Sequence, residues 1–157
     1  MNLTIRKMRE EDLDELTEMW YSLAKMHEDI MEGYELSENP KNSWKKFMKK
    51  SFDKEKMTTF VAENNENLIG FVSVVIRRRP PFFEDRDVGM ILDLYVKESF
   101  RNKGVGGRLV SEAETWIKEN KVDVAVLTVA PVNIQAKIFW NARGYSTYLE
   151  KKRKELR

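Results

Sequence analysis

A short glycine-rich segment has the residue types and spacing that most clearly indicate chemistry in this chain. Residues Arg101–Arg108 read Arg-Asn-Lys-Gly-Val-Gly-Gly-Arg and separate a strongly apolar run from an amphipathic one. Glycines carry no β-carbon, so backbone amides in this segment can approach a ligand closely. If the second run is a helix, its first amides have no partner within the helix and lie at the positive end of its dipole. The segment therefore predicts a site for an anion such as a diphosphate, with Arg101, Lys103 and Arg108 adding positive charge.

Two better-known phosphate-binding loops do not match this segment. A nucleotide triphosphatase loop has a Lys-Ser or Lys-Thr pair after its last glycine, and none follows Gly107. The dinucleotide fingerprint has a different glycine spacing and follows the first strand of the fold. Two alternatives remain at this stage. One is a strand-to-helix turn with ordinary surface cations, because short glycine motifs also occur by chance. The other is a nucleotide-binding module that uses the same loop.

A single acid interrupts the apolar run Val88–Val96. Asp93 is the only carboxylate inside that segment, and an unpaired buried carboxylate is costly. Such a group invites a functional interpretation as a base or as an anchor for an amine. The alternative is a structural one, in which Asp93 pairs with a cation or caps a neighbouring turn.

Periodicity predicts the elements that position these residues. The expected strands are Leu3–Met8, Thr58–Glu63, Leu68–Arg77, Val88–Val96, Val122–Val129 and Tyr145–Lys151. The expected helices are Glu11–His27, a short helix around Trp44–Met48, Gly104–Asn120 and Ile134–Ala142. The asparagine-rich segment Asn64–Asn67 predicts a hairpin turn. This order predicts an α/β fold with a central mixed, mostly antiparallel sheet of about six strands and helices on both faces.

Composition limits the classes of protein that fit. The chain has 157 residues, of which 41% are hydrophobic and 34% charged, with a net charge of +2. These values fit one domain over residues 1–157 and give no strong field for nucleic acid or an anionic membrane. The absence of cysteine excludes thiolate catalysis and Cys-based metal sites, and one histidine makes a His-rich metal site implausible. Since no apolar run reaches the length of about 20 residues that a membrane helix needs, we expect a cytoplasmic protein.

Two motifs together resemble the GCN5-related N-acetyltransferase (GNAT) family over nearly the whole chain. The first is Arg101-x-x-Gly104-x-Gly106, and the second is Asn133-x-x-Ala136-x-x-Phe139-Trp140-x-x-x-Gly144-Tyr145. The resemblance implies a single-domain GNAT fold whose sheet is splayed between its fourth and fifth strands. It also implies transfer of an acetyl group from acetyl-CoA to a primary amine by direct attack in a ternary complex. Many family members dimerise, so a homodimer is one assembly that the resemblance implies.

The resemblance implies a definite layout for the cofactor. Backbone groups of the strand would pair with the pantetheine arm, amides of the glycine-rich loop would hold the pyrophosphate, and the second motif would flank the thiol end. The residues implied to bind acetyl-CoA are Leu94, Tyr95, Val96, Arg101, Asn102, Lys103, Gly104, Val105, Gly106, Gly107, Asn133, Ala136 and Phe139. For Leu94, Val96 and Phe139, plain core packing is compatible with this role.

The catalytic groups are less fully defined. The amine must be neutral to attack, so a base or a water chain is needed, and Asp93 is the candidate base or amine anchor. Family members often carry a tyrosine acid where this chain has Trp140, and an indole cannot act as an acid. Solvent or another tyrosine would then protonate the thiolate. Tyr145 is a weak candidate, with Tyr95 and Tyr148 as alternatives.

Two loops are candidates for the walls of the acceptor pocket. The resemblance implies that the loop between the first two helices and the loop before the long central strand line the pocket. The candidate residues are Glu28, Tyr34, Phe82 and Glu84. Acidic and aromatic residues suit a small cationic amine such as a polyamine, although a solvated charged face has the same composition. His27 is expected at a helix end on the surface, and the alternative is a proton relay.

Three other functions stay open at this point. The acceptor can instead be a protein N-terminus or a lysine side chain. A third reading is an acyl-CoA-binding regulatory domain without turnover.

Overall fold

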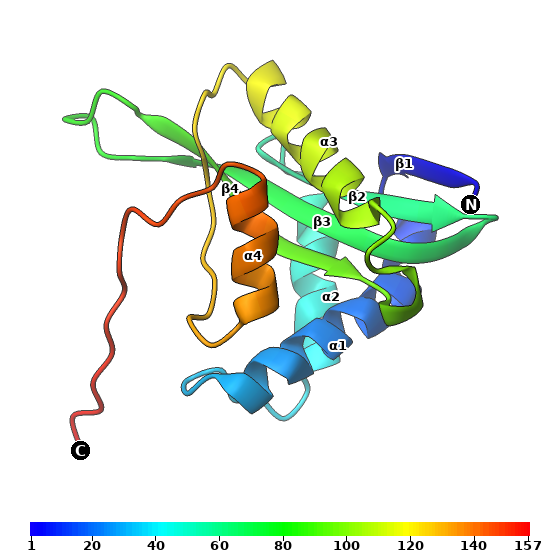
Figure 1. The fold of residues 1–157 in the computed structure, drawn as a ribbon, viewed down its shortest axis with the longest axis horizontal. Helices are drawn as coiled ribbons and strands as arrows, with labels where there is room; N and C mark the ends of the chain where they lie inside the picture. The colour runs from blue at the N-terminus through cyan, green and yellow to red at the C-terminus, as the bar shows by residue number, and fades with distance from the viewer. The chain divides into compact units, whose positions relative to one another are not determined.

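The computed structural model describes all 157 residues, which form two compact units, Met1–Leu127 and Thr128–Arg157 (Figure 1). The first unit contains a five-stranded sheet whose strands follow one another in chain order. The strands are β1 (Leu3–Lys7), β2 (Met57–Asn64), β3 (Asn67–Arg78), β4 (Asp87–Val96) and β5 (Ala125–Val126). Neighbouring strands from β1 to β4 are antiparallel, and β5 is parallel to β4. This mixed, mostly antiparallel sheet confirms the predicted fold class.

Helices cover both faces of the sheet in the first unit (Figure 1). They are α1 (Leu13–Ile30), α2 (Pro40–Ser51) and α3 (Val105–Glu119), with single 3-10 turns at Glu10–Asp12 and Glu98–Phe100. Phe71 of β3 is fully buried in one core with Leu16 of α1 and Met48 of α2. On the opposite face, Gly89 of β4 lies directly against Ile117 of α3. No helix of the chain is both long and apolar enough to cross a membrane.

The hairpin between β2 and β3 has the predicted tight turn. Asn64 pairs with Asn67, so the loop consists of two residues. Both loop residues have positive φ, 49° at Asn65 and 70° at Glu66. Positive φ at both positions defines the turn type whose twist matches the flanking strands, and asparagine tolerates it well.

A bulge and an early end to pairing shape β4. Ser73 of β3 is opposite Asp93, and Val74 is opposite Ile91, so Leu92 is an extra residue in β4. Such a bulge bends the strand that carries it. Pairing with β5 is limited to two residues of β4, which lie just before the bulge. The remainder of β4 has an open edge, and this confirms the predicted splay between the fourth and fifth strands.

Two predicted strands differ in the structure. The expected strand Val122–Val129 pairs only at Ala125–Val126, because β4 bends away beyond that point. The expected strand Tyr145–Lys151 is wrong, because it has no neighbouring strand to satisfy its backbone groups. The sheet therefore has five strands instead of about six. The second unit contains one helix, α4 (Ile134–Ala142). One domain over residues 1–157 stays a prediction.

We expect Gly70 of β3 to be intolerant of a side chain. A β-carbon there would lie 2.7 Å from the Tyr95 carbonyl oxygen and 3.3 Å from Leu109 Cδ1. A backbone oxygen cannot rotate away, so Gly70→Ala would force β3 and β4 apart. The free energy of unfolding should fall by about 1 to 3 kcal/mol, as measured by urea denaturation. A loss below about 0.5 kcal/mol, the range of an ordinary surface substitution, would contradict this close approach.

Candidate functional site

The glycine-rich segment forms the turn between β4 and α3. Gly104 precedes the helix with a φ of +83°, and Asn102 also has a positive φ of 60°. Arg108 donates its backbone N–H to the Gly104 carbonyl at 3.2 Å. The amides from Val105 to Gly107 lie ahead of this bond, so they have no acceptor within the helix. The turn thus presents free amides at the positive end of a 15-residue helix, a suitable place for an anion.

The basic side chains around this turn have different positions. Arg101 donates from Nε to the Val96 carbonyl at 2.8 Å, and its guanidinium lies 5.5 Å from the centre of the Tyr95 ring. Arg101, Lys103 and Arg108 are all exposed, and Arg108 Nη1 donates to the Leu3 carbonyl of β1 at 3.4 Å. Arg101 therefore ties the turn to the end of β4, while all three cations add positive charge to its surface.

The end of β4 presents backbone groups that no strand pairs with. Lys97 donates its N–H to the Ile69 carbonyl of β3 at 2.8 Å. Residues in an antiparallel pair alternate in the direction of their backbone groups. The amides and carbonyls of Val96 and Leu94 therefore point away from β3, toward the open edge. Tyr95 lies between them, so its backbone faces β3. The Val96 carbonyl accepts from Arg101 Nε, so the groups left for a ligand on this edge are the Leu94 amide and carbonyl and the Val96 amide.

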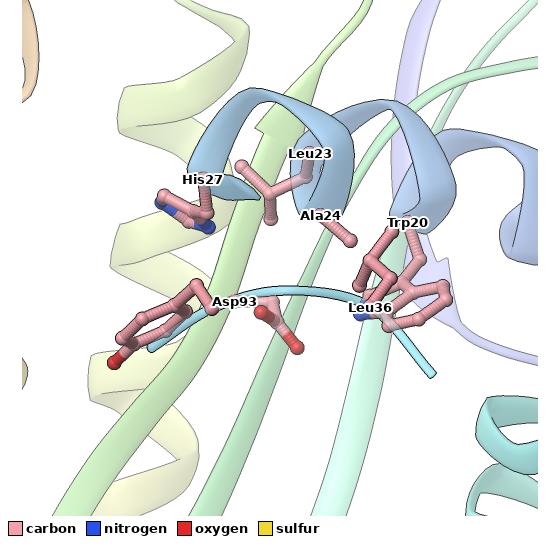
Figure 2. Close-up of a pocket in the computed structure, with 7 residues that line it drawn as sticks. Trp20, Leu23, Ala24, His27, Leu36 and Asp93 are labelled. Carbon is pink, nitrogen blue, oxygen red and sulfur yellow. The ribbon is translucent and has the colours of Figure 1, made fainter. Parts of the chain in front are cut away.

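Asp93 lies in a cavity of about 210 Å³ beneath α1 (Figure 2). The cavity is lined by Trp20, Leu23, Ala24, His27, Tyr34, Leu36 and Asp93. Four of these residues come from α1, two from the loop after it and one from β4. In Figure 2, Asp93 lies below α1 with Trp20 and Leu36 on one side and His27 on the other. The cavity therefore has mostly apolar and aromatic walls around one carboxylate.

The Asp93 carboxylate has no hydrogen bond or ion pair within the chain. It keeps a small accessible surface, and burial in the cavity raises the pKa of Asp93 to about 6. Desolvation has this effect because it disfavours the charged form of a carboxyl group. Asp93 is thus mostly charged at pH 7 and lacks a cation, so the cavity suits a positively charged ligand.

His27 lines the same cavity, although the sequence favoured a surface position for it. Its side chain is half-buried, and desolvation lowers the pKa of His27 below its ordinary value near 6.5. The imidazole is therefore neutral at pH 7 and can accept a proton. The signal for its position was the helical spacing of Trp20, Leu23, Ala24 and His27, which places them on one face of α1.

The loop after α1 closes the cavity and is held by Glu28. The backbone N–H of Leu36 donates to Glu28 Oε2 at 2.7 Å, and Lys25 donates to the other carboxylate oxygen. Tyr34 lines the cavity as predicted, but Glu28 does not. The sequence proposed Glu28 as a substrate residue, whereas in the structure its carboxylate fixes the loop that carries Tyr34 and Leu36.

The other two predicted acceptor residues lie elsewhere. Phe82 and Glu84 are on the turn between β3 and β4, and neither lines the Asp93 cavity. Phe82 is 80% exposed and contacts the Phe83 ring at a centroid distance of 4.9 Å. Their predicted role in acceptor binding has no support from this cavity.

A second, shallower groove of about 330 Å³ lies on the other side of the Trp20 and Leu36 wall. Its lining is Trp20, Glu35, Leu36, Ser37, Pro40, Ser43 and Trp44. The Trp20 and Trp44 rings stack with centroids 5.1 Å apart and an interplanar angle of 11°. Glu35 is the only charged residue in this lining, so the groove combines indole surface with one carboxylate.

The second motif lies in the second unit. Asn133 Oδ1 accepts from the Ala136 N–H at 3.1 Å and so caps α4. Trp140 contacts Phe139 and Tyr145 edge-on, at centroid distances of 5.0 and 5.1 Å. Tyr145 is therefore a packing partner of Trp140. The predicted cofactor roles of Asn133, Ala136 and Phe139, and the acid role of Tyr145, stay predictions.

Comparison with known proteins identifies relatives of the whole chain. A protein from Archaeoglobus fulgidus described as an uncharacterized N-acetyltransferase is 28% identical over 88% of this chain and 89% of its own length. The L-2,4-diaminobutyric acid acetyltransferase of Halalkalibacterium halodurans is 34% identical over 59% of this chain and 48% of its own length. The crystal structure of a tetramutant of the BH1408 protein from Bacillus halodurans superimposes with a TM-score of 0.84. It is 21% identical and covers 98% of this chain and 99% of that one.

The model of the acetyltransferase (GNAT) family matches residues 20–145, which extend across both units. The match includes the glycine-rich turn, the open edge of β4, Asp93 and α4. The chain belongs to the GNAT family and is an acetyl-CoA-dependent N-acetyltransferase.

Proposed function

We propose that the protein acetylates a small cationic primary amine that binds in the Asp93 cavity. The observation that carries this proposal is the unpaired Asp93 carboxylate in an aromatic-walled cavity, on the strand whose edge is open beyond Met90. Such a carboxylate can bind an ammonium group, and tryptophan and tyrosine walls favour the same charge.

The residues of the first unit fit acetyl-CoA. The free amides from Val105 to Gly107, with Lys103 and Arg108 beside them, suit its pyrophosphate. The Leu94 carbonyl and the Val96 amide on the open edge suit the amides of its pantetheine arm, in the manner of an added strand. The bound cofactor supplies the acetyl thioester that the amine attacks.

The chain supplies binding, proton transfer and charge stabilisation. Asp93 anchors the incoming ammonium group. His27, which is neutral at pH 7 because burial lowers its pKa, accepts the proton that the amine must lose. The Leu94 amide on the open edge donates a hydrogen bond to the carbonyl oxygen as negative charge develops on it. Solvent or a tyrosine protonates the thiolate.

The size and charge of the site favour a diamine or polyamine over a protein acceptor. A cavity of about 210 Å³ accepts only a slender chain end. The groove beyond Trp20 and Leu36 adds a second carboxylate, Glu35, for a second cationic group. The relative named for L-2,4-diaminobutyric acid acts on an acceptor with two amino groups. A lysine side chain or a protein N-terminus remains the second candidate.

A thiol-release assay across an amine panel tests this proposal. The panel contains putrescine, spermidine, 2,4-diaminobutyrate, a monoamine of equal length, a lysine peptide and a peptide with a free N-terminus. We expect kcat/KM to be highest for the diamines and polyamines. Acetyl-CoA binding without turnover on any amine would instead favour a regulatory domain, and a preference for either peptide would favour a protein acceptor.

Glu28→Ala should weaken acceptor binding without affecting the cofactor. The substitution releases the Leu36 amide, so the loop that carries Tyr34 and Leu36 loses its tie to α1. The loop can then leave its place beside the cavity, so the acceptor KM should rise severalfold. The Kd for coenzyme A, measured by calorimetry, should stay unchanged.

Glu28→Gln is the matched control for this variant. Its amide oxygen can still accept from the Leu36 N–H, so most of the acceptor affinity should be retained. An unchanged acceptor KM in Glu28→Ala would show that this loop does not form the acceptor site.

A further inference from the structure

Two buried hydroxyl groups lie on the sheet face that α1 covers. Thr59 of β2 and Ser73 of β3 are 4% and 1% exposed, and their hydroxyl oxygens are 2.9 Å apart. Other buried hydroxyls of this chain bond within their own helix, as Thr17 does to the Leu13 carbonyl at 2.6 Å and Ser51 to Met48. The Thr59–Ser73 pair is different because it joins two strands in the interior of the sheet.

The pair has one more hydroxyl hydrogen than the hydrogen bond between its two members uses. Two hydroxyls carry two hydrogens, and one hydrogen bond between them uses only one. A second hydroxyl hydrogen therefore needs an acceptor in a region where an unsatisfied polar group is costly. If Thr59 donates to Ser73, the hydrogen left over belongs to Ser73, on the strand next to β4.

The strand register places an acceptor beside Ser73. Thr59 is the cross-strand partner of Ser73, and Ser73 is the cross-strand partner of Asp93. Directly opposed residues extend their side chains on the same face of a sheet, with β-carbons about 4.5 to 5.5 Å apart. Thr59, Ser73 and Asp93 thus form one polar row across three strands, which ends in the cavity beneath α1.

We propose that Ser73 is a positioning residue for Asp93. Thr59 donates to the Ser73 oxygen, and the Ser73 O–H is directed to the Asp93 carboxylate through one water molecule in the cavity. The row holds the carboxylate in place and stabilises its charged form.

The neighbourhood of Asp93 leaves few other groups that could do this. From α1, His27 faces the cavity, and from the loop after α1, Tyr34 does. Trp20 of α1 also lines the cavity and carries an indole N–H that can donate. The other lining residues are apolar, and α3 packs on the opposite face of the sheet. Of the strands beside β4, β5 ends before the bulge, and β3 contributes Ser73. Ser73 is therefore the only hydroxyl donor from the sheet opposite this carboxylate.

The direct test is an NMR titration of the Asp93 carboxyl carbon in the wild-type protein and in Ser73→Ala. Loss of a donor to the charged form should raise the pKa of Asp93 by about 0.5 to 1 unit. The matched control is Ser51→Ala, which removes another buried hydroxyl, from α2, and should lower stability without moving this pKa. A pKa that moves by less than about 0.2 unit in Ser73→Ala, or that moves equally in the control, would overturn the proposal.

Two further variants test the same proposal if Ser73→Ala does not fold. Ser73→Cys keeps the shape of the side chain but substitutes a much poorer donor, so the pKa of Asp93 should rise by a smaller amount. Thr59→Val should act in the same direction, because Ser73 then loses the donor that orients its hydroxyl. If the pKa of Asp93 keeps its wild-type value in both variants, the proposed role of Ser73 is wrong.

The effect of Ser73 on turnover rests on the proposed function, in which Asp93 anchors the amine. Kinetic measurements can test the two claims separately. If Asp93 anchors the amine, the acid limb of kcat/KM against pH should move upward with the pKa measured by NMR. A shift by NMR with an unmoved acid limb would support the role of Ser73 and contradict the role of Asp93 in turnover.

Discussion

Asp93→Asn should lower kcat/KM by at least about a hundredfold and should make the folded protein more stable at neutral pH. The amide has almost the same shape as the carboxylate but carries no charge to hold the ammonium group. The loss should fall mainly on kcat/KM for the amine, measured by initial rates, while the Kd for coenzyme A stays unchanged, because the turn before α3 is unaffected.

The gain in stability follows from the pKa of Asp93. That pKa is about 6 in the folded protein, above the ordinary value of 3.8. Between these values the folded state binds more protons than the unfolded state, so the free energy of unfolding falls as pH rises from about 4 to about 6. The charged carboxylate therefore costs about 2 to 3 kcal/mol above pH 6. The Asp93→Asn variant should lack this pH-dependent loss and should have a higher Tm at pH 7.

Asp87→Asn is the matched control on the same strand. Asp87 is at the start of β4 and pairs with Arg78 at 3.3 Å on the surface. The same chemical change there should leave both turnover and its pH dependence as in the wild type. Full activity in Asp93→Asn would refute the assignment of the amine site to this cavity.

Gly104→Val should weaken coenzyme A binding by at least tenfold, which corresponds to about 1.4 kcal/mol. Gly104 has a φ of +83°, and a β-branched residue is strained in that conformation. The turn would relax toward negative φ, and the amides that follow it would no longer converge on one anion. Calorimetric titration with coenzyme A measures the effect.

Gly144→Val provides the control for strain alone. Gly144 has a φ of +86°, and a β-carbon there meets nothing within 4 Å, as at Gly104. Both variants should lose a similar amount of thermal stability, but only Gly104→Val should lose affinity for coenzyme A. Equal affinity in the two variants would mean that the turn before α3 does not hold the pyrophosphate.

Features encoded by adjacent residues were predictable from the sequence. The glycine-rich turn and the acid within an apolar strand are local patterns, and the structure has Gly104 at the start of α3 and Asp93 in a cavity. Helices α1 and α3 form close to their predicted bounds, and α4 spans Ile134–Ala142 as predicted, whereas α2 extends beyond the predicted Trp44–Met48 at both ends.

Features that depend on distant partners were not predictable in the same way. The cavity needs α1, β4 and the loop after α1 together, so Leu36 had no signal of its own and His27 was assigned to the surface. Glu28 has the composition of a substrate ligand, but a charge pattern cannot distinguish a carboxylate that binds substrate from one that binds the Leu36 amide. The segment Tyr145–Lys151 has residues typical of a strand, but no other strand pairs with it, so no strand forms.

The tie between Glu28 and Leu36 also bears on how specificity can diverge among related enzymes. Two walls of the Asp93 cavity, Tyr34 and Leu36, are in the connection between α1 and α2, whereas the amides that suit the pyrophosphate are in the turn between β4 and α3. Substitutions, insertions and deletions in that connection can reshape the cavity without altering the sheet or the nucleotide end of the site. Acceptor preference can therefore change by mutation of one surface segment, while the acetyl donor stays the same.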